Sequence, residues 1–382
     1  MDKAKRLYIV TFGCQMNVRD SEVVAGLLQK AGYKLTYSRQ KADVIIFNTC
    51  SVRQHAEDKV WSEIGRFKDS KIIGVIGCMA QNYKQAVFAR AAQVDFVVGP
   101  ADIHKIPEII KSFTRGGKEQ SLKKGESPFF LRKIWETDGE KRPEEIYHTG
   151  FYADKEHAYV VISEGCSNFC SYCVVPYVRG ALRHRKHADI LNEIKAALDQ
   201  GITKVTLLGQ NVNAYQHGSI DFIRLISMVG SIDGLKEFSF ITSHPKDASS
   251  ALFKAMADSE KLKQYLHLPV QSGSHRILKL MNRGYTAKYY LELADNYRTI
   301  VKGAKLTTDV IVGFPSETEN DFRDTYNIIK KIGFDAAYIF KYSPRPNTAA
   351  LKLDDDVPKK EKERRHALIL ELQKKISRNK KC

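Results

Sequence analysis

Short β-branched runs and amphipathic stretches alternate through the first part of the chain. The apolar runs are Leu7–Phe12, Val44–Phe47, Ile72–Ile76 and Phe96–Val98. Between them, apolar positions recur with a helical period over Asp20–Ala31, Gln54–Phe67 and Tyr83–Ala91. Near-continuous apolar strands that alternate with amphipathic helices are typical of a parallel sheet covered on both faces. Residues 5–113 are therefore predicted to form an open parallel α/β sheet domain.

The pattern changes beyond this domain. Residues 114–151 are rich in glycine and charge without a clear period, which predicts a linker. Six further apolar runs then alternate with helical stretches, which is typical of an incomplete (β/α)6 barrel over residues 152–382, ending in a basic helix. The six runs are Tyr159–Ser163, Lys204–Leu208, Glu237–Ile241, Tyr265–Leu268, Lys305–Val312 and Ala337–Tyr342.

The length and charge of the chain indicate how many domains it has and what kind of partner it binds. A chain of 382 residues exceeds the usual size of a single core, which agrees with two domains. Its formal net charge of +17 favours a polyanionic partner, nucleic acid before membrane, although a solvated lysine-rich surface is the alternative. No apolar run reaches about 18 residues, and no signal peptide is evident, so we expect a cytoplasmic protein without a membrane partner.

Three apolar runs of the first domain are each followed by a cysteine: Cys14, Cys50 and Cys78. Because the carboxyl ends of parallel strands share one edge of a sheet, these thiols are expected to meet there despite their wide spacing. The alternative is that they are three small buried core residues, since free cysteine packs well in cores. A seventh cysteine, Cys382, lies in the basic tail and is expected to be a bystander.

The first strand of the predicted barrel leads into a CxxxCxxC loop formed by Cys166, Cys170 and Cys173. Three thiolates this close together can ligate three irons of a cubane cluster and leave the fourth iron open. A structural zinc site needs four protein ligands, so zinc with the nearby His184 and His187 is the lesser alternative. The loop predicts radical use of S-adenosylmethionine (SAM), with Tyr172 placed to pack near the adenine.

Long consecutive motifs then indicate a family. The chain resembles the radical SAM methylthiotransferase family, and within it the tRNA-modifying MiaB type. In the first domain the matching motifs are Gly13–Asn17, Asp20–Glu22, Asn48–Arg53 and Gly77–Gln81. In the barrel they are the cysteine loop, Pro176–Gly180, Leu208–Tyr215, His267–Ser274, Thr308–Pro315 and Tyr342–Pro346. The run Gly209–Tyr215 most favours the isopentenyladenosine subgroup.

This resemblance implies a second [4Fe-4S] cluster on Cys14, Cys50 and Cys78, which carries the sulfur to be inserted. The family's reaction uses two SAM molecules and methylthiolates carbon 2 of N6-isopentenyladenosine, the base next to the anticodon in tRNA. Because an aromatic C–H resists ordinary side-chain bases, a radical cofactor supplies that step and the protein supplies positioning. The implied partners are tRNA, a reductant such as flavodoxin or ferredoxin, and an unknown sulfur donor; we expect a monomer.

Radical SAM barrels also imply contacts to SAM itself. Gly209, Gln210 and Asn211 are expected to approach its amino group, and the segment from Asp309 to Gly313 its adenine and ribose. Arg179 is expected to contact a carboxylate or phosphate. Each of these residues has an alternative role in a turn or in the core. His244 and His267 are expected to be polar residues near the barrel and not ligands.

Three further expectations concern an additional domain, other substrates and a non-enzymatic role. Family members usually carry a small RNA-binding TRAM domain after the barrel; here it is expected to be absent, so that either the chain is truncated or its basic tail and surface contact tRNA. The same chemistry could act on threonylcarbamoyladenosine in tRNA or on a ribosomal-protein aspartate. A non-enzymatic alternative is an iron–sulfur RNA-binding electron carrier or sensor, although carriers normally supply four cysteines per cluster.

Overall fold

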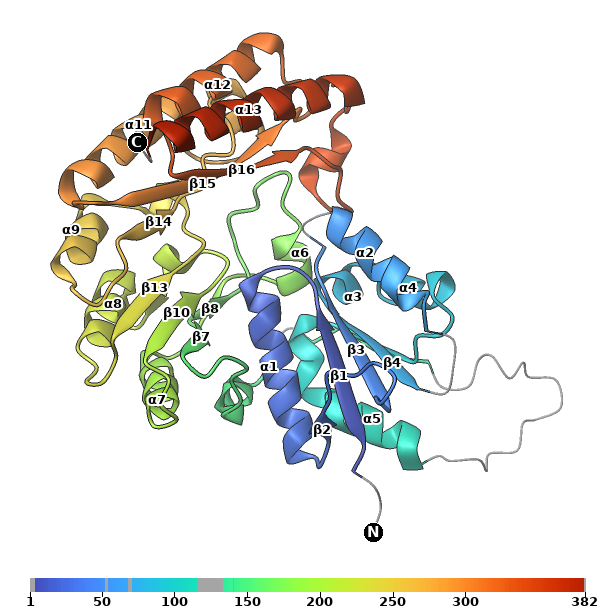
Figure 1. The fold of residues 1–382 in the computed structure, drawn as a ribbon. Helices are drawn as coiled ribbons and strands as arrows, with labels where there is room; N and C mark the ends of the chain where they lie inside the picture. The colour runs from blue at the N-terminus through green and yellow to red at the C-terminus, as the bar shows by residue number, and fades with distance from the viewer. Residues whose placement is uncertain (1–3, 52–53, 68–70, 116–132, 140, 381–382) are drawn as a thin grey trace. The chain divides into compact units, whose positions relative to one another are not determined.

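The computed structural model describes residues 4–51, 54–67, 71–115, 133–139 and 141–380. The chain divides into two compact units, which are drawn in Figure 1. One comprises residues 1–154 together with 177–180 and is called the sheet unit below. The other comprises residues 155–176 and 181–382 and is called the barrel unit. Each unit has its own sheet system and its own group of cysteines.

The sheet unit is built on one six-stranded sheet. Its strands are β1 (Arg6–Thr11), β2 (Lys34–Leu35), β3 (Val44–Thr49), β4 (Ile72–Gly77), β5 (Phe96–Val98) and β6 (Ile134–Glu136). They lie in the order β2-β1-β3-β4-β5-β6, and every neighbouring pair is parallel. The open parallel sheet predicted from the sequence is therefore confirmed.

Helices follow the strands of this sheet, and the periodic pattern predicts three of these stretches, over 20–31, 54–67 and 83–91, but not the helices at 78–83 and 106–115. The helices are α1 (Gln15–Lys30), α2 (Gln54–Ile64), α3 (Cys78–Tyr83), α4 (Ala86–Arg90) and α5 (Ile106–Arg115), with 3-10 turns at Pro100–Lys105 and Glu144–Thr149. Every residue of β3 is buried, as a central strand covered on both faces requires. Phe47, Val60, Ile64 and Val75 belong to one core cluster between sheet and helices.

Residues 114–151 were predicted to be a linker, but one short segment of them, strand β6, belongs to the sheet. Strand β6 pairs in parallel with β5, with Val97 opposite Trp135. It is a three-residue edge strand without a fully buried position, so no apolar run marks it in the sequence. Residues 116–132 and 140 of the predicted linker lie outside the described residues.

The barrel unit contains the six predicted strands in two parallel sheets. They are β7 (His157–Val161), β10 (Lys204–Leu208), β13 (Glu237–Phe240), β14 (Tyr265–His267), β15 (Lys305–Val312) and β16 (Ala336–Lys341). The sheets run β13-β10-β7 and β14-β15-β16, and a parallel bridge from Phe238 to Leu262 connects them just before β14. The spatial order thus follows the chain order, with β7 and β16 at the two ends, which confirms an incomplete barrel.

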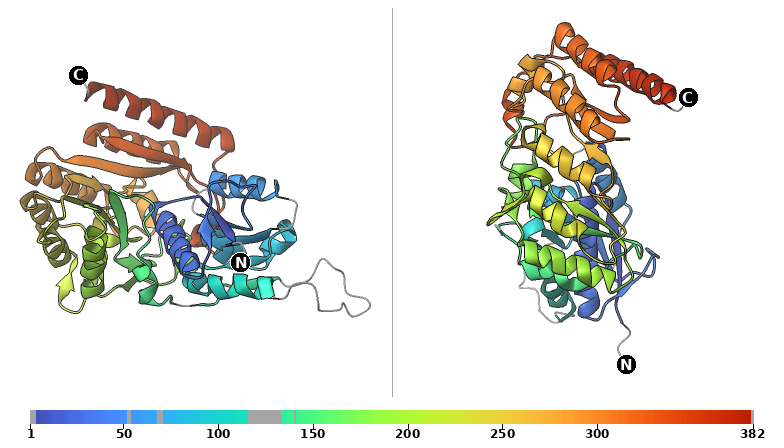
Figure 2. Two further views of the ribbon diagram at one scale, coloured as in Figure 1. Left: turned by 60° about the horizontal axis from the view of Figure 1, so that its bottom comes forward. Right: turned by 90° about the vertical axis from the view of Figure 1, so that its left-hand side faces the viewer.

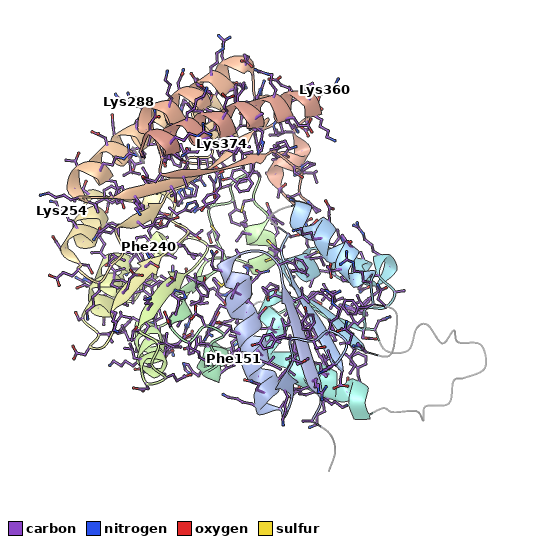
Figure 3. The ribbon with its side chains drawn as sticks, in the orientation of Figure 1. Phe151, Phe240, Lys254, Lys288, Lys360 and Lys374 are labelled. Carbon is purple, nitrogen blue, oxygen red and sulfur yellow. The ribbon has the colours of Figure 1, made fainter. Side chains whose placement is uncertain are left out.

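The helices of this unit stand between or after its strands. They are α7 (His187–Leu198), α8 (Phe222–Gly230), α9 (Ser250–Asp258), α10 (His275–Leu280), α11 (Ala287–Ile300), α12 (Glu319–Ile332) and α13 (Lys359–Asn379), while the residues of α6 (Val175–Arg179) are divided between the two units. Helix α13 packs against α12 and β16 and buries Ile369 and Leu372 (Figure 2). Its opposite face carries exposed cations, among them Lys360 and Lys374 (Figure 3).

Across the described ranges, none of the helices combines the length and the apolar character that crossing a bilayer requires.

Candidate functional site: two groups of cysteines

The three strand-end cysteines of the sheet unit lie after neighbouring strands. Cys14 follows β1 and is the N-cap residue of α1, Cys50 directly follows β3, and Cys78 follows β4 and begins α3. Strands β1, β3 and β4 are consecutive in the sheet, so the three thiols come from adjacent connections at one edge. Cys50 and Cys78 are buried, whereas Cys14 is exposed.

The connections that carry Cys14 and Cys50 are in direct contact. A Cβ atom placed on Gly13 would lie 2.5 Å from the Cβ of Cys50 and 3.1 Å from its Sγ. The buried Asn17 side chain ties the two connections together, because its Nδ2 donates to the carbonyls of Phe12 and Thr49, both at 2.9 Å. Glycine before the first cysteine is therefore a packing requirement of this edge.

Gly13→Ala is expected to disrupt the strand-end cysteines. The substitution adds a clash to a backbone with φ of +115°, so the free energy of unfolding should fall by roughly 2–5 kcal/mol. Gly32→Ala is the matched control, because its φ is also positive but nothing lies near its added Cβ. It should lose only about 1–2 kcal/mol and keep wild-type iron content. Denaturant unfolding and iron analysis compare the two; equal losses would contradict the packing argument.

A buried ionic network surrounds Cys78. The Arg179 Nε donates to the Sγ of Cys78 at 3.3 Å, and its Nη2 donates to Asn17 at 3.1 Å and to Asp20 at 2.7 Å. The other Asp20 oxygen accepts from Arg142 at 2.7 Å. Burial acts to raise the pKa of Asp20, but the charges of Arg142 and Arg179 hold it below its ordinary value. Asp20 is therefore ionised, and Arg179 places positive charge at the Cys78 sulfur.

Burial also acts on the cysteine itself. It raises the pKa of the Cys78 thiol, and the Arg179 charge opposes that rise. The sequence-based expectation gave Arg179 a contact to a ligand carboxylate or phosphate. The structure provides this guanidinium with a carboxylate from the chain itself, at the strand-end cysteines.

The second group lies in the barrel unit, in the loop that follows β7 and the short strand β8 (Ser163–Glu164). Cys166 and Cys170 are buried and Cys173 is half-buried. The segment that follows α10 forms two hydrogen bonds with this loop. The Met281 carbonyl accepts from the Ser171 amide at 3.0 Å, and the Asn282 Nδ2 donates to the Phe169 carbonyl at 3.0 Å. The loop is thus held by hydrogen bonds on both sides of Cys170.

The chemistry of these donors suits a metal cluster. Burial raises the pKa of the Cys173 thiol to about 12 and also raises that of Cys166, and neighbouring cysteine charge adds to both rises. Three adjacent thiolates therefore need positive charge beside them, which a bound metal centre supplies. Within the described ranges, no three Cys, His, Asp or Glu side chains converge closely enough for a single ion. A cubane instead takes each thiolate on a different iron, so its ligands stand farther apart.

Unpartnered polar atoms gather at the carboxyl ends of the same strands. Each of these side chains follows β7, β10, β13 or β14 and has a buried polar atom without a hydrogen-bond partner: Ser163, Gln210, Asn211, Ser243, His244 and Gln271. Buried polar atoms are normally paired, so such a group indicates a place for a polar ligand. Gln210 and Asn211 were expected from the sequence to contact SAM. Gly209 allows this connection to lie close to Ser163, because a Cβ there would collide with the Oγ of Ser163.

The remaining predicted contacts already have partners within the barrel unit. Tyr172 packs against an apolar cluster that includes Ile277, Met281 and Phe314. Asp309 Oδ2 lies 3.3 Å from the Nε2 of His267. The Gly313 amide, at a φ of +67°, donates to the Glu317 carboxylate at 2.6 Å. Their proposed contacts to SAM stay predictions.

Four polar residues of the barrel were not singled out from the sequence for the site. Ser163, Ser243 and Gln271 belong to the unpartnered group, and Arg283 donates to Cys170. The first three share one signal that could have found them, because each lies at or just beyond the carboxyl end of a predicted strand. No comparable signal marks Arg283, since it follows a helix.

His244 is held as a neutral ring. Its Nδ1 accepts a hydrogen bond from the Lys246 amide at 3.2 Å, so the ring proton is on Nε2. Burial, together with the charges of Arg283 and Lys246, lowers the pKa of His244 to about 2. The ring therefore presents an N–H donor among the unpartnered polar atoms.

His244 should make the stability of the fold depend on pH. At pH values between the pKa of His244 in the folded chain and its ordinary pKa of 6.5, the imidazole binds a proton only in the unfolded chain. The folded state therefore loses stability as the pH falls below 6.5. From pH 7.5 to 5.5, wild type should lose about 1.4 kcal/mol of unfolding free energy that His244→Gln does not lose. Anaerobic denaturant unfolding of both chains at the two pH values measures the difference. Parallel pH profiles would show that the folded ring is protonated like a free histidine.

Known families match both units. The family described as "Uncharacterized protein family UPF0004" matches residues 6–99, and the radical SAM superfamily matches residues 160–329. Among solved structures, the radical SAM methyltransferase TsrM from Kitasatospora setae is similar with a TM-score of 0.60 at 12% identity, over 91% of this chain and 74% of that one. The cobalamin-dependent SAM radical enzyme OxsB gives 0.55 at 13%, over 95% and 56%. At this identity the likeness concerns the fold alone.

Fold and cysteine loop together define the class, a radical SAM domain joined to an N-terminal parallel-sheet domain. A protein from Carboxydothermus hydrogenoformans is 42% identical over 98% of this chain and 84% of its own length. Another from Geobacter sulfurreducens is 41% identical over 99% of this chain and 84% of its own length. Both are named tRNA-2-methylthio-N(6)-dimethylallyladenosine synthase. The chain belongs to this synthase family.

Proposed function

We propose that the chain methylthiolates carbon 2 of N6-isopentenyladenosine (dimethylallyladenosine) next to the anticodon in tRNA. The observation that carries this proposal is the end-to-end similarity to synthases of that name, 42% identity over 98% of the chain. The similarity spans both units and therefore both groups of cysteines. Methylthiolation of threonylcarbamoyladenosine or of a protein aspartate uses the same chemistry and is distinguished by the product.

Each group of cysteines is assigned one [4Fe-4S] cluster. Cys166, Cys170 and Cys173 hold the cluster whose open iron binds SAM, and Cys14, Cys50 and Cys78 hold the second cluster. Reduced cluster and SAM together supply a carbon radical strong enough to remove the aromatic hydrogen. The donor sets fit this assignment, because each offers three thiols and leaves one iron open.

The chain's own residues bind and orient the reactants. The unpartnered atoms of Gln210, Asn211, Ser243 and Gln271 offer hydrogen-bond partners to the polar groups of SAM. The Nε2–H of His244 adds a donor at the same end of the barrel. Tyr172, packed on the apolar cluster, covers the loop on one side and excludes water from it. These roles amount to positioning, while the cofactors perform the difficult chemistry.

The partners follow from charge and substrate. A formal net charge of +17 suits the phosphate backbone of tRNA, and exposed cations of α13 such as Lys360 and Lys374 contribute to it. A small electron carrier such as flavodoxin or ferredoxin would reduce the clusters. We place the protein in the cytoplasm as a monomer, where tRNA and such carriers are available.

The test is the modified nucleoside itself. The chain is expressed in bacteria that lack their own synthase, and bulk tRNA is digested and analysed by mass spectrometry. The methylthio derivative of isopentenyladenosine should appear, and it should be missing when the Cys14→Ala chain is expressed instead. Persistence of unmodified isopentenyladenosine alongside methylthiolated threonylcarbamoyladenosine would overturn the proposed substrate.

A further inference from the structure

Arg283 is a buried arginine in direct contact with the cysteine loop. It follows α10, and only 4% of the residue is exposed. Its Nη1 donates to the Sγ of Cys170 at 3.2 Å, its Nη2 to the Pro269 carbonyl at 2.9 Å, and its Nε to the Tyr285 hydroxyl at 3.0 Å. Three donors with three different partners fix the guanidinium in one orientation.

No carboxylate is among the partners of Arg283 in the part of the chain that the structure describes. Two other buried arginines of this unit do have one: Arg185 pairs with Glu193, and Arg365 pairs with Glu317 at 2.7 Å. A buried cation without an anion is strongly unfavourable, because desolvation is not offset by a Coulombic partner. The charge of Arg283 therefore requires an anion that is supplied by something other than an acidic side chain.

The cysteine loop is where that anion would lie. The Nη1 of Arg283 donates to the sulfur of Cys170, the middle cysteine of the loop that also carries Cys166 and Cys173. The guanidinium carbon of Arg283 lies 5.3 Å from the centroid of the Tyr285 ring, which shields it from water. Arg283 is thus a buried cation in direct contact with the cysteine loop.

We propose that Arg283 is a positioning residue that balances the charge of the cluster-bound thiolates and raises the reduction potential of the SAM-binding cluster. The inference rests on the proposed function, in which Cys166, Cys170 and Cys173 hold that cluster. Reduction adds one negative charge to the cluster, so a fixed cation beside a ligand sulfur stabilises the reduced form more than the oxidised form. Because guanidinium does not lose its proton, this effect is constant with pH.

Arg179 provides the contrast in the other unit. It also donates to a cysteine sulfur, but it shares its charge with the Asp20 carboxylate. An arginine that already forms an ion pair alters the charge at its sulfur less than an arginine without one. The SAM-binding cluster is therefore the one whose electron uptake depends on an arginine.

The experiment is a redox titration of the full-length chain. Cys14, Cys50 and Cys78 are changed to alanine, so that only the SAM-binding cluster contributes to the electron paramagnetic resonance signal after anaerobic reconstitution. Arg283→Gln should shift the ratio of reduced to oxidised cluster at least tenfold toward oxidised at a fixed potential, about 59 mV for one electron. Arg283→Lys keeps the charge and should fall between Arg283→Gln and the parent chain.

Arg298→Gln is the matched control. Arg298 lies in α11 and donates to the backbone carbonyls of Ile332 and Gly333, which precede β16. Its loss should leave the titration unchanged. If Arg283→Gln fails to retain iron, the iron content per chain is compared instead. Arg283→Lys should then retain more iron than Arg283→Gln and less than the parent chain.

Two contrary outcomes have different meanings. Equal titration and occupancy for Arg283→Lys and Arg283→Gln would overturn the charge-balancing role, because Arg283→Lys keeps the positive charge and Arg283→Gln removes it. A parent chain that shows no [4Fe-4S] signal at all would instead overturn the assignment of the cluster to Cys166, Cys170 and Cys173.

Discussion

Changing Cys173 to alanine should abolish both the cleavage of SAM and the methylthiolation of tRNA. Losing a group that merely supports a metal ligand already costs about 10- to 100-fold, so losing the ligand itself should cost more than about 100-fold. Both activities fall together because the carbon radical is required for the later insertion of sulfur. The measurement is deoxyadenosine formed from SAM under strong reductant, with the modified nucleoside followed in parallel.

The control for this variant is Cys382→Ala, which removes a cysteine outside both groups. It should retain full activity in both assays. A Cys173→Ala chain that still releases deoxyadenosine at the wild-type rate would contradict the assignment of SAM chemistry to the barrel loop.

The same pair of assays should separate the two groups when Cys14 is changed. Cys14→Ala is expected to leave SAM cleavage within a few-fold of wild type while methylthiolation is lost entirely. Cys14 is the exposed member of its group, so its side chain can be shortened without leaving a buried cavity. The sheet unit therefore remains folded, and the loss reports the sulfur-bearing cluster and not a collapse of the domain.

Circular dichroism and thermal unfolding verify that the Cys14→Ala chain is folded. Loss of SAM cleavage in a folded Cys14→Ala chain would show that the two groups do not act separately. Full methylthiolation by this variant would show that Cys14 is not needed to hold the sulfur-bearing cluster.

Much of this arrangement follows from the periodic pattern. Strands β3 and β4 contain the near-continuous apolar runs Val44–Phe47 and Ile72–Ile76 because both of their faces are covered, and such runs are recognisable without any homologue. Once they are identified as parallel, the position of a cysteine directly after each strand determines the edge at which it lies. The placement of Cys14, Cys50 and Cys78 after adjacent strands could thus be predicted before the structure was available.

Contacts across long stretches of sequence could not be predicted in this way. Strand β6 carries no apolar run, and its pairing with β5 joins segments that are far apart in the sequence. The ion pairs of Asp20 with Arg142 and Arg179 link residues that are 122 and 159 positions apart. Periodicity reports which face of an element is buried but gives no information about which distant polar side chain meets it. Arg283 remained unnoticed for the same reason.

The central claim is that two clusters are held by two separate groups of three cysteines. Iron and acid-labile sulfide per chain after anaerobic reconstitution test it most directly, on wild type and on the Cys166/Cys170/Cys173→Ala variant. Two cubane clusters require about eight irons in wild type and about four in the variant. About four irons falling to none would contradict the account and make the strand-end cysteines ordinary core residues.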